Sequence, residues 1–95
     1  MKDSKEIFLI QAINVIQQLE KTYTKADLEK GVLNVILDRY RHAVWIVKVN
    51  GQLEHIMIKG GTRAYLDQFS DYTNPLLEEM YLSEKLLEEL ITKSK

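Results

Sequence analysis

The segment from Ala43 to Lys59 constrains the fold of this chain most, because it carries the most specific local pattern in the sequence. Two runs rich in β-branched residues flank Asn50-Gly51, a dipeptide that suits a two-residue type I′ turn, since both turn positions need a positive φ angle. Such a turn also fixes the register of the two strands that it joins. The pattern therefore predicts an antiparallel β-hairpin over residues 43–59, with Asn50 and Gly51 as its turn.

Periodic apolar residues predict helices on both sides of this hairpin. The first helix spans residues 4–23, with Ser4 as its cap, and a short helix capped by Thr62 spans about residues 62–70. The last helix spans about residues 74–92, because Asn74-Pro75 places a capping residue directly before a proline at the first helical position.

Residues 24–41 fit two structures. Thr24 and Asp27 form a capping start, and the polar residues that follow fall on one face of a helix that runs to about Arg41. In the alternative, Gly31 stops a short helix, and the alternation over residues 32–38 forms a strand. We favour the helix, because an interior glycine costs only about 1 kcal/mol and the apolar face outweighs this cost.

The predicted fold is therefore α+β. It consists of an antiparallel β-hairpin packed with about four helices, in the order α-α-β-β-α-α. If residues 32–38 form a strand instead, the hairpin extends to a three-stranded meander.

Length and composition predict a single domain over residues 1–95. The chain is 45% apolar and 28% charged, which is typical of a globular protein. No apolar run approaches the roughly 20 residues that span a bilayer, and the acidic N-terminal residues argue against a signal peptide. The chain contains no cysteine, which excludes disulfides and thiolate nucleophiles and fits a reducing compartment. We therefore expect a cytoplasmic protein that does not enter a membrane.

The net charge of −1 conceals an uneven distribution. From residue 39 to residue 63 there are five basic residues against Glu54, a net charge of +4, whereas residues 64–95 carry seven acids against three lysines, a net charge of −4. The basic segment is a candidate surface for an anionic or protein partner. Its candidate binding residues are Arg39, Arg41, His42, Lys48, Lys59 and Arg63.

A dimeric nucleic-acid-binding regulator is the alternative function, because two helices followed by a hairpin is the order of elements in a winged-helix domain. The basic segment over residues 39–63 would then contact phosphates. The candidate recognition helix weakens this hypothesis, since it is mostly apolar and its polar face carries Asp27, Asn34 and Asp38.

The turn from Gly60 to Arg63 could expose backbone N–H groups to an anion, but it lacks the phosphate-loop pattern. A flexible exit from the second strand and an ordinary helix cap explain this turn as well.

The sequence offers little catalytic chemistry. His42 and His55 are the only imidazoles. Neither has a serine or threonine neighbour, and neither has an acid placed to orient it, as a nucleophilic triad requires. No spacing of histidines and acids matches a metal site. We therefore expect no catalytic residues, no metal, no cofactor and no enzymatic activity.

The first predicted helix suggests self-association. Its apolar stripe is wider than one face, because Ile7, Leu9, Ile10 and Ile13 extend it, and a chain this short covers such a helix poorly without a second copy. The sequence therefore favours a small regulatory or protein-interaction protein that acts as a homodimer and binds a further protein partner.

Overall fold

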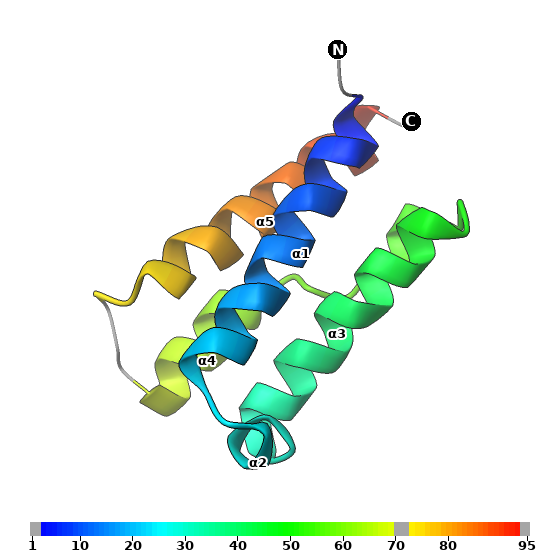
Figure 1. Ribbon diagram of the computed structural model, residues 1–95. Coiled ribbons are helices and arrows are strands. Elements are labelled where there is room, and N and C mark those ends of the chain that lie inside the picture. Colours follow the sequence, from blue (N-terminus) through cyan, green and yellow to red (C-terminus); the bar gives the residue numbers. More distant parts are fainter. Residues whose placement is uncertain (1–2, 70–72, 94–95) are drawn as a thin grey trace.

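The computed structural model describes residues 3–69 and 73–93, and the described chain is a helical bundle (Figure 1). Its elements are α1 (Ser4–Thr22), α2 (Lys25–Leu28), α3 (Gly31–Lys48), the short 3₁₀ helix η1 (Leu53–His55), α4 (Gly61–Phe69) and α5 (Pro75–Lys93). These described residues contain no β-strand. The predicted α+β fold is therefore wrong.

Helix α1 organises the bundle, because it packs along both α3 and α5. Figure 1 shows α1 running antiparallel to each of these two helices. Helix α4 packs against α3 and α5, and η1 packs against the same two helices. Within residues 3–69 and 73–93, none of the helices combines the length and apolar character that crossing a bilayer requires.

Residues 43–59 do not form the predicted hairpin. The part up to Lys48 completes α3, and the rest comprises η1 and an irregular connection to α4. Helical spacing governs burial throughout α3, whose buried residues are Leu33, Ile36, Leu37, Tyr40, Ala43 and Ile46. The β-branched residues lower helix propensity by at most about 0.7 kcal/mol each, whereas fully burying a large apolar side chain contributes about 1.5–3 kcal/mol. The packing of the apolar face therefore outweighs the local preference for a strand.

Asn50 and Gly51 end helix α3 instead of turning a hairpin. The Gly51 N–H donates to the Ile46 carbonyl at 2.8 Å, and the Asn50 N–H donates to the Val47 carbonyl at 3.2 Å. Asn50 has a φ of +57°. This pair of bonds around a left-handed residue is the Schellman motif, in which asparagine is the usual substitute for glycine. The predicted need for a positive φ was correct at Asn50, but the element that uses it is a helix end.

The connection after η1 keeps the alternation of a strand without a partner strand. Ile56 and Ile58 are buried, whereas Met57 between them is 61% exposed. Both isoleucines belong to the hydrophobic core of the bundle. The period of two that suggested a second strand therefore reflects a single extended segment lying on helices.

The predicted helix from Thr24 to Arg41 is divided into α2 and α3. The Thr24 hydroxyl accepts a hydrogen bond from the Asp27 N–H at 3.2 Å, and the Asp27 carboxylate accepts one from the Thr24 N–H at 3.3 Å. The predicted capping start is thus confirmed. Gly31 has a φ of +57°, which allows the chain to turn between the two helices. Residues 32–38 are helical, so the favoured helix is confirmed there and the three-stranded meander is wrong.

The ends of the long helices follow simple capping chemistry. Asp3, rather than the predicted Ser4, caps α1, since its carboxylate accepts a hydrogen bond from the Glu6 N–H at 2.8 Å. Asn74 precedes Pro75 at the start of α5, as predicted, and its side-chain oxygen accepts a hydrogen bond from the Leu76 N–H at 3.0 Å. The predicted end of the preceding helix at residue 70 lies outside the described residues.

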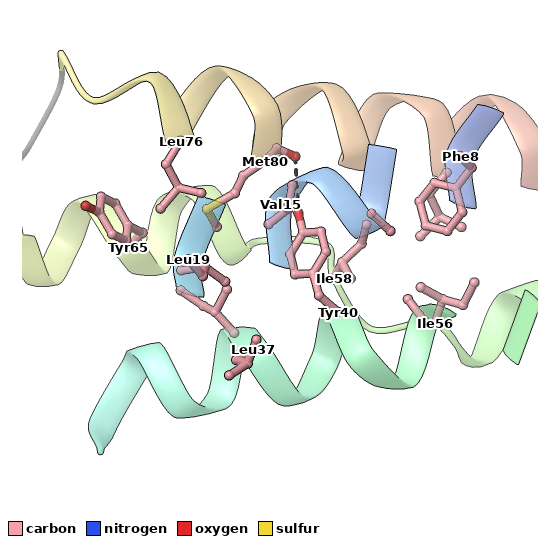
Figure 2. Packing of buried hydrophobic residues seen from close by; sticks show 14 of the residues in the cluster. Phe8, Val15, Leu19, Leu37, Tyr40, Ile56, Ile58, Tyr65, Leu76 and Met80 are labelled. Atoms are coloured by element: carbon pink, nitrogen blue, oxygen red, sulfur yellow. Dashed lines mark hydrogen bonds between the residues drawn. The ribbon is translucent and has the colours of Figure 1, made fainter. Parts of the chain in front are cut away.

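Tyr40 is one of two tyrosines buried in the core, the other being Tyr65. Figure 2 shows the Tyr40 side chain reaching from α3 to the backbone of α5, where its hydroxyl donates to the Met80 carbonyl at 3.4 Å. Ser83 lies one turn further along α5, is also fully buried, and donates to the Glu79 carbonyl at 2.9 Å. Burial raises the pKa of Tyr40 well above its ordinary value, the Ser83 side chain opposes the rise, and the negative charge of Glu84 adds to it.

We expect the free energy of unfolding to fall as the pH rises above about 10, the ordinary pKa of tyrosine. The unfolded chain then loses the Tyr40 proton, whereas the folded chain retains it because its pKa is raised. One such group contributes at most about 1.4 kcal/mol per pH unit. Urea unfolding at pH 9 and pH 11 measures the loss, and the Tyr40→Phe variant should show a correspondingly weaker pH dependence. Equal pH dependence in the two proteins would contradict the assignment.

Candidate interaction surface

The six predicted binding residues do not meet on one surface. Arg39, Arg41, His42 and Lys48 lie on α3, Lys59 lies in the connection to α4, and Arg63 lies on α4. Arg39 and Arg41 are two positions apart, so they point to nearly opposite sides of α3. The basic segment of the sequence is therefore spread over several sides of the bundle.

Three of these residues surround the single tryptophan. Trp45 is 58% exposed, and Arg41, His42 and Lys48 are its neighbours at helical spacing on α3. The His42 ring stacks on Trp45, with ring centroids 5.7 Å apart. Arg41 pairs with Glu20 of α1 at 3.5 Å, and both side chains are at least half exposed. Such a pair contributes about 0–1 kcal/mol, so it does little to fix this surface.

The anion that Gly60–Arg63 could bind is supplied by the protein itself. One oxygen of the Glu84 carboxylate accepts from the Gly60 N–H at 2.7 Å, and the other accepts from the Thr62 N–H at 3.1 Å and from the Thr62 hydroxyl. Glu84 thus reaches from α5 to satisfy donors at the start of α4, where a negative charge is favourable. Thr62 does not cap α4 with its own side chain, and Arg63 is exposed beside an N-terminus that is already occupied.

A groove of about 510 Å³ lies between α5 and the connection that follows α3. Its lining residues are Glu54, Ile56, Lys59, Tyr81, Glu84, Lys85, Leu87, Glu88, Ile91 and Thr92. Charges of both signs stand around an apolar base, so the groove favours neither an anion nor a cation. Lys59 is the one predicted binding residue in its lining.

The described residues show no arrangement for catalysis or metal binding. Neither His42 nor His55 makes a side-chain hydrogen bond to another residue within the described chain. No group of three histidine, aspartate or glutamate residues in that part of the chain could hold a metal ion. The contacts of the two histidines therefore add no support for an acid–base site.

The outward face of α1 is uncharged over residues 7–19. From Ile7 to Leu19 the sequence contains no Asp, Glu, Lys or Arg, and the exposed residues of this stretch are Ile7, Ile10, Asn14 and Gln17. Their spacing of three, four and three places them in one line along the helix. The solvent face of a helix normally carries charged side chains. We refer to these four residues as the α1 strip.

One border of the α1 strip is formed by α5. The Gln11 side chain donates to the Glu79 carbonyl at 3.0 Å, which places these two residues at the contact between the helices. Ile7 lies one turn before Gln11, and Leu82 lies about one turn after Glu79. Because α1 and α5 are antiparallel (Figure 1), Ile7 and Leu82 are displaced from that contact in the same direction along the bundle. Ile7 and Leu82 are each 43% exposed, and Ile10 is 39% exposed.

The other border is formed by α3. Two contacts mark where α1 and α3 meet, the Arg41–Glu20 ion pair and a hydrogen bond of 3.0 Å from the Lys5 ammonium to the Asn50 side chain. Trp45 lies between these contacts along α3, one turn after Arg41. Exposed apolar side chains thus occur on both helices that border the α1 strip, at levels along the bundle that the strip also spans.

Sequence reasoning identified part of this surface. It recognised that Ile7 and Ile10 widen the apolar stripe, and the structure leaves both side chains exposed. It did not identify Asn14, Gln17 or Trp45 as surface neighbours of these isoleucines. The available signal was the absence of charge over residues 7–19, which is uncommon in a helix that faces water.

Comparison with known proteins places the chain in a family. Residues 3–94 match the family described as "YeeD uncharacterised protein". The chain is 37% identical over 89 residues to a protein of Bacillus subtilis (strain 168) named "Uncharacterized protein YeeD", and the match covers 85% of this chain and 87% of that protein. No solved structure matches the chain. The chain therefore belongs to the YeeD family.

Proposed function

We propose that this member of the YeeD family is a small, cytoplasmic, non-enzymatic protein that acts as a homodimer and regulates or binds a further protein. The observation that carries the proposal is the α1 strip, the uncharged and solvent-facing line of Ile7, Ile10, Asn14 and Gln17. Depletion of charge is the compositional mark of the centre of a protein–protein interface.

The α1 strip suits contact with protein because part of it is apolar and exposed to water. Ile7 and Ile10 each leave about two fifths of their surface in water, and Leu82 on the bordering helix α5 leaves a similar fraction. Removing apolar surface from water contributes roughly 25 cal/mol per Å², so covering this patch would stabilise the protein. Exposed apolar patches on small proteins are commonly interaction sites.

Protein contact fits this arrangement better than nucleic-acid binding. A winged-helix domain requires a hairpin after its recognition helix, and residues 43–59 end α3 and connect it to α4. Phosphate binding also requires basic residues on one face, whereas Arg39 and Arg41 lie on nearly opposite sides of α3. Both parts of the nucleic-acid hypothesis are therefore weaker in the folded chain.

The test is the mass of the protein in solution. We expect sedimentation equilibrium to give the mass of a dimer at tens of micromolar. The Ile10→Lys variant should be monomeric under the same conditions, with a dissociation constant raised about 30-fold or more. The reason is that the few hot-spot residues at the centre of an interface contribute at least about 2 kcal/mol each, and we expect Ile10 to be one of them.

The matched control is Val35→Lys, which makes the same kind of change at an exposed apolar residue of α3. Val35 is 44% exposed, close to the 39% of Ile10, and is ten residues before Trp45, toward the opposite end of α3. This variant should remain a dimer. If the unmodified protein is a monomer at about 100 μM, the homodimer is ruled out. If it is a dimer that Ile10→Lys leaves intact, the α1 strip is not its interface.

A further inference from the structure

We infer that the two copies associate with their α1 helices parallel, so that α3 of one copy lies opposite α5 of the other. The inference rests on the proposed homodimer and adds its symmetry. A two-fold axis along the α1 strip would generate this arrangement, because rotation about it keeps the direction of α1 and exchanges the two sides of the bundle.

The spacing of the α1 strip supports helix pairing. Ile7, Ile10, Asn14 and Gln17 follow the alternation of three and four residues that places side chains along the contact line of two paired helices. In a parallel pair each residue faces its own copy, so isoleucine meets isoleucine and amide meets amide. Asparagine and glutamine amides contain both a donor and an acceptor, and two copies can therefore hydrogen-bond to each other.

An antiparallel pair centred on the α1 strip would join unlike residues. Ile7 would face Gln17, and Ile10 would face Asn14. A buried amide without a hydrogen-bond partner costs about 1–3 kcal/mol. This register would also bring Asp3 near Lys21 at each end, but an exposed ion pair contributes only about 0–1 kcal/mol. The mismatch in the centre therefore outweighs the attraction at the ends.

The charges of the flanking helices point to the same arrangement. On the side of α3 that faces away from Arg39, the charged residues are Arg41, Lys48 and Asp38, a net charge of +1. Glu84, Lys85 and Glu88 line the groove. The rest of α5 carries Glu78, Glu79 and Glu89 against Lys93, a net charge of −2. Helix α1 between them carries two acids and two lysines and is neutral. The centre of the surface is thus neutral, with one positive border and one negative border.

Symmetry determines which borders meet. When the paired α1 helices are parallel, α3 of each copy faces α5 of the other, so opposite charges meet on both sides. When they are antiparallel across the same surface, α3 faces α3 and α5 faces α5, so like charges meet. Complementary charges favour one docking orientation, and like charges oppose the other. The amides and the charges of the flanking helices both favour the parallel pair. Asp3 would face Asp3 and Lys21 would face Lys21 at its exposed ends, and repulsion between exposed charges is small compared with these two contributions.

The test uses disulfide formation, which is specific here because the chain contains no cysteine. Gln17→Cys should form a covalent dimer on mild oxidation, since a disulfide requires Cα atoms about 4.4–6.8 Å apart and a parallel pair brings residue 17 of both copies together. An equal mixture of Ile7→Cys and Gln17→Cys proteins should not form the mixed dimer above background. Asp67→Cys, at an exposed position on α4, measures that background, and Gln17→Cys should react at least about ten times faster.

Each result has a defined meaning when the mass of every variant is measured before oxidation. A dimer in which Gln17→Cys links to itself supports the parallel pair. A dimer that forms only the mixed link between positions 7 and 17, or neither link, would overturn the parallel pair and leave the homodimer standing. A monomer at every concentration would remove the inference together with the proposed function.

Discussion

Replacing Phe8 with alanine is expected to lower the free energy of unfolding by about 3–5 kcal/mol. Phe8 lies on the face of α1 opposite Ile10, and it is fully buried in the cluster shown in Figure 2. Truncation removes apolar contacts and leaves a cavity, because the surrounding helices relax only partly. For a domain of this size the loss corresponds to a decrease in melting temperature of at least about 12 °C.

Urea unfolding followed by circular dichroism measures this change. The protein concentration must be held constant, since association of copies would add to the apparent stability. The matched control is Phe8→Leu, which keeps most of the apolar volume and should cost about 1–2 kcal/mol. A change below about 1 kcal/mol for Phe8→Ala would show that α1 does not pack in the core as described here.

Replacing Glu84 with alanine is expected to lower the free energy of unfolding by about 2–3 kcal/mol. The substitution removes the acceptor for the Gly60 N–H, the Thr62 N–H and the Thr62 hydroxyl at once. Hydrogen bonds to a charged group contribute about 1.5–3 kcal/mol each. Because Glu84 is partly exposed, water can replace some of these bonds, and the expected loss is smaller than their sum. Hydrogen exchange should show the earliest opening at the start of α4.

Two variants isolate the role of this carboxylate. Glu84→Gln keeps one acceptor oxygen, so it should recover part of the stability that Glu84→Ala loses. Glu88→Ala changes an exposed glutamate one turn further along α5 and should alter stability by no more than about 0.5 kcal/mol. Equal effects of Glu84→Ala and Glu88→Ala would contradict the proposed contact between α5 and α4.

The largest error in the predicted fold was the β-hairpin over residues 43–59, because the sequence pattern that indicated it also occurs at the end of a helix. An Asn-Gly dipeptide indicates a left-handed backbone conformation, which occurs both in type I′ turns and at helix ends. The run around Val44 and Ile46 has high β propensity, but it also continues the helical spacing that begins at Leu33. Local preference could not decide between these structures, because the deciding energy is burial of the apolar face in the folded bundle.

Predictions based on neighbouring residues were more successful. The capping bonds of Thr24 with Asp27 and the start of α5 at Asn74-Pro75 depend on side chains a few positions apart. The Glu84 contact with the start of α4 joins residues 22–24 positions apart, and no short motif indicates it. Contacts of this kind depend on how the helices are arranged, and the wrong α+β arrangement concealed it.

For the candidate surface too, the sequence revealed what depends on one helix and did not reveal what depends on how the helices are arranged. The excess apolar width of the first helix is visible in the sequence through Ile7 and Ile10, because it follows from spacing within a single helix. The position of Trp45 beside that helix was not visible, since it requires α3 to continue as far as Lys48. In the predicted hairpin, Trp45 would have faced a second strand.

The buried hydrogen bond between Tyr40 and the Met80 carbonyl has a consequence for the uniqueness of the fold. Helices held together by aliphatic contacts alone can slide by one turn, about 5.4 Å, with little change in buried area. Sliding of α3 relative to α5 would leave the Tyr40 hydroxyl without its acceptor in a dry environment, at a cost of about 1–3 kcal/mol. This single polar contact therefore selects one axial alignment among several that the apolar side chains alone would tolerate.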